Sequence, residues 1–284
     1  MRSTTFACVC AAVMACGAAA GAAQQQPLEP VTVALSDPSR PGTVRANVMM
    51  GSITVTGENR KDVLITPRAR AGRPDAPAWP TTRGRNREPE DVPPGMRRLS
   101  QPGDLRVTEE NNQISVGVGS FMRPMDLDIR VPSRTALRLT SMNGSIVVDG
   151  VEGEIEVNSH NGGVTLTNVA GAVVAVSMNG TVKATLSRVA ADKAMSFVSM
   201  NGTVDVTLPA SVRANFKMRS ERGDVYTDFD LQLRTAESRS ERSRSANGRF
   251  RYEVNDAIYG SANGGGPEIE LRTFNGRVML RKGP

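Results

Sequence analysis

Few residues in this sequence have the types and spacing that could do chemistry, and the first is a single histidine. His160 is the only histidine, so a catalytic triad of serine, histidine and acid would have to include it. Its place in a repeat is otherwise taken by Met142, Met178 and Met200. A repeat position that accepts both methionine and histidine is typical of a structural corner. We therefore predict no catalytic or metal-binding role for His160.

Carboxylates form three pairs with a spacing of two: Asp126 with Asp128, Glu154 with Glu156, and Glu268 with Glu270. This spacing puts both acids of a pair on one face of a β-strand, opposite the apolar residues. Some sugar-cleaving β-helices build their sites from such acids, so a carbohydrate-active enzyme using strand-face carboxylates is the alternative function. Because the pairs lie in different repeats, a solvated strand face is the simpler interpretation. We predict that the protein is not an enzyme.

Metal binding is not indicated either. A calcium-binding nonapeptide roll repeats an Asp after a glycine-rich turn in unit after unit. The matching positions here hold other residues, namely Val147, Glu156, Thr165 and Lys183 or their neighbours. The cysteines are confined to the start of the chain, at Cys8, Cys10 and Cys16, so a chain cut after Ala23 has no thiolate ligand and no disulfide. We predict no metal site and no cofactor.

The first 23 residues have the composition of an export signal. Arg2 precedes an apolar run over residues 6–20, which is too short to span a bilayer, and small residues follow up to Ala23. We predict a signal peptide over residues 1–23 and a mature chain that starts at Gln24. This chain would be extracytoplasmic, in the periplasm or at the cell surface, without a transmembrane segment. Lipoprotein processing at Cys16, which would leave a lipid anchor, is the alternative.

An internal repeat fills the middle of the sequence. Glycines recur nine residues apart, at Gly144, Gly153, Gly162, Gly171 and Gly180. Each precedes a short run whose second and fourth residues are apolar, which is the period of a β-strand. Two half-repeats make an 18-residue unit marked by Ser-x-Asn-Gly at 141–144, 159–162, 177–180 and 199–202. The last interval is 22 residues, which indicates an insertion near 189–194, and degenerate copies lie at 51–55, 222–225 and 275–280.

Such short strands cannot bury an apolar face alone, but stacked coils about 4.8 Å apart can. One buried column would contain Ile146, Val164, Val182 and Val204, and the next Val148, Leu166, Ala184 and Val206. We therefore predict an all-β, single-domain parallel β-solenoid (a β-helix) over residues 24–284, right-handed, with about 18 residues per coil. An antiparallel meander is the alternative, because Asn-Gly is also a strong hairpin signal.

The Asn-Gly pairs carry two further expectations. Asn and Gly both tolerate the left-handed conformation, which we expect at each corner of the coil. Stacked Asn side chains should also hydrogen-bond to one another along the axis.

Two stretches interrupt the repeat and carry the net positive charge of the chain. Residues 68–104 contain 8 Arg and 5 acidic residues, and residues 234–251 contain 6 Arg and 2 acidic residues. We predict disordered insertions at 67–104 and 235–248. Aromatic residues are only 4% of the chain and the compartment is extracytoplasmic, so we expect no nucleic-acid partner. Arginines in these segments would instead meet anionic envelope polymers or lipid headgroups by screened attraction. The alternative is that they only solubilise the loops and discourage edge pairing.

With residues 129–132, the Asn-Gly repeats and the closing segment 275–278, the chain resembles the bacterial "putative adhesin" family of unknown function, a relative of the head GIN putative adhesins. The resemblance covers about residues 31–282 outside the insertions. It implies an extracytoplasmic parallel β-solenoid and supplies no catalytic residues.

These observations favour a non-enzymatic scaffold or adhesion-type binding protein of the cell envelope or surface. Its ligand is unknown and would be a protein or an anionic envelope polymer. We predict that any partner surface involves a stripe made of Met142, His160, Met178 and Met200, which strand alternation turns outward. The alternative is that the corner tucks these side chains against a neighbouring turn. Met279 is expected to be buried.

Overall fold

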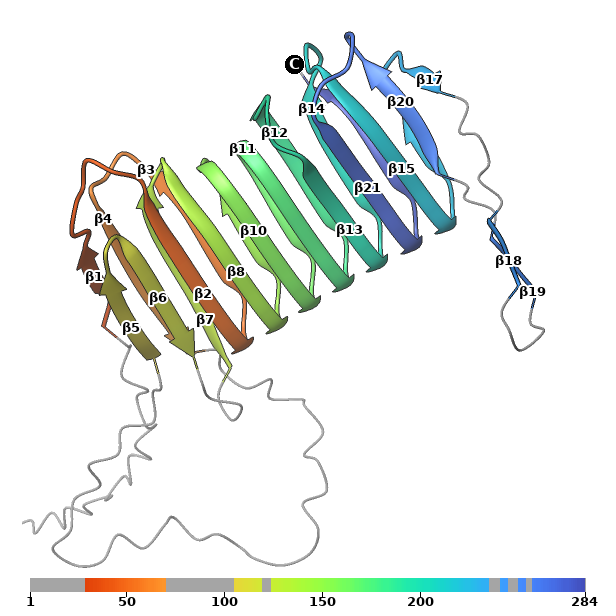
Figure 1. Ribbon diagram of the computed structural model, residues 1–284. Coiled ribbons are helices and arrows are strands. Elements are labelled where there is room, and N and C mark those ends of the chain that lie inside the picture. The colour runs from red at the N-terminus through yellow and green to blue at the C-terminus, as the bar shows by residue number, and fades with distance from the viewer. Residues whose placement is uncertain are drawn as a thin grey trace, which may run out of the picture.

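The structure is a computed structural model that describes residues 29–69, 105–118, 124–234, 241–244, 250–253 and 257–283. Within these ranges the chain forms strands and turns and contains no helix, which confirms the all-β prediction. Twenty strands belong to one sheet, and two more form a separate hairpin. Figure 1 shows the large sheet as two layers of strands stacked along one long axis.

The first layer is called wall A. In spatial order it contains β5 (Leu105–Glu110), β6 (Gln113–Val118), β2 (Gly42–Met50), β8 (Thr135–Asn143), β10 (Glu152–Asn161), the second half of β11 (Val164–Asn179), β13 (Met195–Asn201), β21 (Glu268–Asn275), β15 (Ala214–Arg222), β20 (Ile258–Ala262) and β17 (Gln232–Arg234).

The second layer is called wall B. In spatial order it contains β1 (Val31–Ala34), β4 (Asp62–Ala69), β7 (Met125–Pro132), β3 (Ile53–Glu58), β9 (Ile146–Asp149), the first half of β11, β12 (Val182–Val189), β14 (Val204–Pro209), β22 (Val278–Gly283) and β16 (Val225–Thr227).

Neighbouring strands in the middle of both walls run parallel, in the register that the repeat predicts. Val157 lies opposite Leu139 on one side and Ala175 on the other, each one 18-residue unit away. After the inserted residues Val176 pairs with Val198 in the same way. Antiparallel pairs occur toward the two ends of the stack, where β4 pairs with β7, β5 with β6 and β20 with β15.

The order of the repeats in space differs from their order in the chain. A rung is defined here as one strand of each wall joined by a corner. The rung β2–β3 lies between β6–β7 and β8–β9, and the rung β21–β22 lies between β13–β14 and β15–β16. The first and last repeats are therefore paired on both sides, and neither leaves an open edge for another chain to join.

The apolar core fills the space between the walls. The predicted column of Ile146, Val164, Val182 and Val204 is fully buried and continues into Ile53 and Val278. The second predicted column, which includes Leu166 and Val206, is also fully buried. Met279 lies between inward-facing Val278 and Leu280, so it points out of wall B and is only half-buried. The expectation that Met279 is buried was wrong.

The Asn-Gly corners depart from the left-handed conformation that the sequence led us to expect. Neither the Asn nor the Gly of the four Ser-x-Asn-Gly units has a positive φ. A Cβ on Gly162 would collide with the backbone carbonyl of Gly144, and one on Gly180 with that of Gly162. Glycine is needed at these corners because adjacent rungs approach too closely for a side chain. Positive φ values occur at other corners: 153° and 120° at Gly153 and Gly171, and 140°, 159° and 151° at Gly51, Gly223 and Gly276 of the degenerate copies.

Parts of the predicted insertions form strands. β4 continues to Ala69, and Pro67 within it is buried opposite Leu127, so the insertion predicted from residue 67 begins later. Within 235–248, Glu241–Arg244 forms β18, which pairs with β19 (Phe250–Glu253). Backbone hydrogen bonds pair these two strands, and such bonds form whatever the side chains are. The rest of both insertions and the predicted signal peptide lie outside the described residues, and no described helix is long and apolar enough to cross a membrane.

Candidate functional site

The outward face of wall A is the largest regular surface that the repeat builds. Each of its strands alternates between side chains that enter the core and side chains that point outward. Because the rungs are in register, the outward residues align in rows along the axis of the stack. The row nearest the Asn-Gly corner contains Met49, Met142, His160, Met178, Met200 and Phe274.

This corner row is exposed, as strand alternation predicted. The exposed fractions are 40% for Met142, 39% for Met178 and 48% for Met200, and His160 is exposed too. Phe274 is 40% exposed and has the Arg222 guanidinium 5.3 Å from its ring centroid. Phe274 escaped notice because its unit reads Thr-Phe-Asn-Gly, with Thr in place of Ser. Whether the row binds a partner stays a prediction.

The two central methionines belong to a wider apolar surface. On β11 the outward residues Val174 and Val176 precede Met178, and on β13 Val198 precedes Met200. Val174 is 40% exposed, while Val176 and Val198 are half-buried. These five residues are called the apolar patch. The sequence indicates this patch by the run 173–176, in which every residue is apolar. Apolar side chains therefore lie on both faces of the strand.

His160 has no catalytic surroundings in the described part of the chain. No described residue hydrogen-bonds to its side chain, and its row neighbours are Met142 and Met178. The serines beside this row point inward, and Ser159 Oγ donates to the carbonyl of Gly144 at 3.2 Å. A serine nucleophile is therefore not presented to His160 on this strand.

The three carboxylate pairs remain apart, on β7, β10 and β21. Each pair is tied to a cation: Glu154 to Lys193, Glu270 to Lys217 at 3.1 Å, and Asp128 to Arg68 at 3.2 Å. The hydrogen bond and charge of Lys193 lower the pKa of Glu154 below its ordinary value. A glycosidase needs one carboxyl with a raised pKa as its general acid, so this shift has the wrong direction.

Potential metal ligands do not gather on the surface that the structure describes. No three His, Cys, Asp or Glu side chains there are grouped so that they could hold a metal ion.

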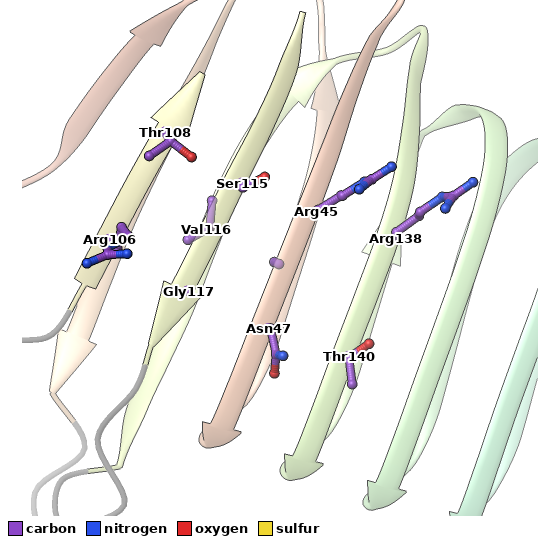
Figure 2. Close-up of a pocket in the computed structure, with 10 residues that line it drawn as sticks. Arg45, Asn47, Arg106, Thr108, Ser115, Val116, Gly117, Arg138 and Thr140 are labelled. Atoms are coloured by element: carbon purple, nitrogen blue, oxygen red, sulfur yellow. The ribbon is translucent and has the colours of Figure 1, made fainter. Parts of the chain in front are cut away.

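Two shallow depressions lie at the N-terminal part of wall A. The first, of about 380 Å³, spans β5, β6, β2 and β8 and is drawn in Figure 2. Three arginines contribute to it, Arg45, Arg106 and Arg138, together with hydroxyl and amide side chains. The second, of about 450 Å³, lies beside it and is lined by Glu154, Glu156 and Lys193, among others. Sequence analysis identified none of the three arginines.

The fold and these surfaces define a class of protein: an all-β repeat protein with a broad exposed strand face. The particular family follows from the sequence, because the Toastrack DUF4097 family model matches residues 100–257. The chain belongs to the Toastrack DUF4097 family, and the resemblance recognised from its repeats is confirmed.

Two solved structures are similar to this chain at low sequence identity. One is a putative cell adhesion protein from Clostridium sporogenes ATCC 15579, with 9% identity and a TM-score of 0.47, covering 91% of this chain and 100% of that one. The other is a putative adhesin from Bacteroides fragilis NCTC 9343, with 10% identity and a TM-score of 0.29, covering 90% and 97%. No curated protein matches the chain.

Proposed function

We propose that this protein is a non-enzymatic, extracytoplasmic β-solenoid of the cell envelope or surface that binds a partner protein through the apolar patch. The proposed solenoid is right-handed with about 18 residues per coil. The offset of 18 residues between stacked Asn143 and Asn161 supports the coil length. Its mature form begins at Gln24 after removal of residues 1–23, with lipid attachment at Cys16 as the alternative.

The single observation that carries the proposal is the exposure of Val174, Met178 and Met200 on one sheet face. A β-strand that packs nothing on its outer face normally carries polar residues there. Exposed methionines are adaptable in shape and are common on binding surfaces.

The surroundings of the patch favour a protein partner. Charged residues flank it on both sides along the axis: Arg138 and Glu156 toward the N-terminus, and Glu270 and Arg272 toward the C-terminus. An apolar centre inside a charged rim is the usual anatomy of a protein–protein interface. A polymer recognised by charge alone would not need the valines.

A binding role also agrees with the state of the acids. The described carboxylate pairs hold cations, and the pKa of Glu154 is lowered. These features stabilise a strand face in water and supply no general acid.

The test compares two matched valines in a capture experiment from envelope extracts of the native host. Val174→Glu alters the patch, whereas Val147→Glu alters an outward, half-buried valine on wall B. We expect the wild type and Val147→Glu to capture the same protein and Val174→Glu to lose it. The purified partner should then slow peroxide oxidation of Met178 and Met200, with buried Met195 and Met218 as internal references.

Equal capture by both variants would place the interface elsewhere. A purified partner that binds without protecting Met178 or Met200 would also refute the proposal. Capture of a polysaccharide without any protein would reject the protein partner in favour of a polymer.

A further inference from the structure

The arginine depression, formed around Arg45, Arg106 and Arg138, shares no residue with the apolar patch, although Arg138 also belongs to the charged rim of the patch. It covers the outward face of β5, β6, β2 and β8, four neighbouring strands at the N-terminal end of wall A. Figure 2 shows Arg45 and Arg138 extending side by side in the same direction, while Arg106 comes from the edge strand β5. All three arginines are exposed.

Positive charge in this depression is only partly balanced by nearby acids. Arg45 and Arg138 are direct partners across β2 and β8, which brings two like charges together. Arg138 has Glu156 at 3.7 Å, and it also lines the second depression together with Glu154. Arg45 and Arg106 have no ion-pair partner among the described residues.

Cations elsewhere on wall A are neutralised more completely. Lys217 pairs with Glu270 at 3.1 Å, and Arg219 pairs with Glu221 at 2.8 Å. Lys193 pairs with Glu154. The imbalance is therefore greater in the depression than around these three cations.

The space between the arginines is open and polar. Gly117 has no side chain, and an added Cβ there would have no neighbour within 4 Å. Thr108 and Ser115 on one side, and Asn47 and Thr140 on the other, supply hydroxyl and amide groups that can donate hydrogen bonds. No carboxylate lines this depression, whereas the second depression, which Arg45 and Arg138 also line, contains Glu154 and Glu156 together with Lys193.

We propose that this depression binds oxyanion groups of a linear polyanion, carrying either phosphate or carboxylate. Guanidinium groups match both anions with paired hydrogen bonds. Arg45 and Arg138 would hold one anionic group between them. Arg106 is two strands from Arg45 and offset by two residues along the strands, or about 12 Å away by strand geometry, so it meets a second group of the same polymer.

Binding here does not require the protein partner at the apolar patch, so the two proposals can fail separately. The test uses fluorescence anisotropy of the full-length mature chain at low salt with three probes: inorganic phosphate as a competitor, labelled short-chain polyphosphate, and labelled oligogalacturonate. Polyphosphate and oligogalacturonate distinguish a phosphate source from a carboxylate source.

We expect Arg45→Gln and Arg138→Gln each to weaken binding of the preferred polymer by about 10-fold, the loss of one charge-assisted contact. Arg106→Gln should weaken binding of the polymer but should not change how well inorganic phosphate competes with it. Glu156→Gln should tighten binding, because it removes the acid beside Arg138. Arg277→Gln is the matched control, since Arg277 is an exposed arginine on the turn before β22.

Two results would overturn the proposal. One is that Arg277→Gln weakens binding as much as Arg45→Gln, which would mean attraction to overall charge. The other is that neither polymer binds the wild-type chain at low salt. Thermal melting of each variant checks that a loss of binding is not a loss of folding.

Discussion

The Asn161 side chain donates a hydrogen bond from Nδ2 to Oδ1 of Asn143 at 3.0 Å, although the residues are 18 positions apart. The same contact repeats from Asn179 to Asn161 and from Asn201 to Asn179, both at 2.9 Å, and from Asn275 to Asn201 at 2.7 Å. Each interior amide therefore donates to the rung before it and accepts from the rung after it. A shift of one residue would break the whole ladder, so it helps to fix the register of the rungs.

Asn179→Ala should lower the free energy of unfolding by about 1–2 kcal/mol, because it removes two hydrogen bonds of the ladder. Asn143→Ala is the matched control at the end of the ladder. It removes only the bond from Asn161 and should cost about half as much. Urea unfolding followed by circular dichroism measures the free energy of unfolding of both variants. Equal decreases would mean that the individual hydrogen bonds of the ladder do not contribute separately to stability.

Gly180→Ala tests why glycine occupies the corners. A Cβ at residue 180 would collide with the backbone carbonyl of Gly162, although the φ of Gly180 is one that alanine can adopt. We expect a loss of stability of about 2 kcal/mol or more from this overpacking. Gly117→Ala has open space and should change the melting temperature little. If the two variants have the same melting temperature, close approach of neighbouring rungs is not the reason for glycine at the corners.

Much of the fold could be predicted from local sequence signals. The buried columns through Val164 and Val182 follow from strand alternation and a fixed repeat length, and both signals are local. The insertion of β2–β3 between two later rungs could not be predicted, because the order of stacking depends on long-range pairing. The corner conformation was mispredicted because Asn-Gly is enriched for two different physical reasons, conformational freedom and close approach.

The sites were predicted unequally for the same reason. The outward methionines Met178 and Met200 follow from alternation within one strand. Val174 lies in an apolar run, which is equally typical of a strand that is buried on both faces. The neighbouring sequence does not indicate that the outer face of this strand is uncovered. Arg45 and Arg138 become neighbours only through the out-of-order rung.

Lys193→Gln should raise the pKa of Glu154 toward its ordinary value, because the hydrogen bond and charge of Lys193 hold it lower. Because the pKa of Glu154 is lower in the folded chain than in the unfolded chain, its charged form stabilises the fold at pH values above the unfolded pKa. This stabilisation is lost as the pH falls through the folded pKa. Glu154 raises the pKa of Lys193. The contribution of Lys193 to stability is therefore present below the pKa of Lys in the unfolded chain and is lost at high pH.

The difference in melting temperature between wild type and Lys193→Gln should therefore be present at neutral pH and vanish in acid. Carbon-13 NMR titration of the Glu154 carboxyl measures the shift directly. Glu154→Gln, which removes the other partner, should show the same loss of pH dependence. An unchanged Glu154 pKa in Lys193→Gln would mean that the two side chains do not interact in solution.

Val182→Asp should disrupt folding, while Lys183→Asp should be mild, although the residues are adjacent in β12. Val182 is fully buried between Val164 and Val204 in the core column. An unpaired carboxylate there costs several kcal/mol, about 4 or more, which is comparable with the whole stability of many domains. Lys183 is exposed and its cross-strand neighbour is Asp205, so Lys183→Asp adds only a screened repulsion between two surface acids. Thermal melting followed by circular dichroism decides the matter: equal melting temperatures for the two variants would mean that β12 presents the opposite face to the core.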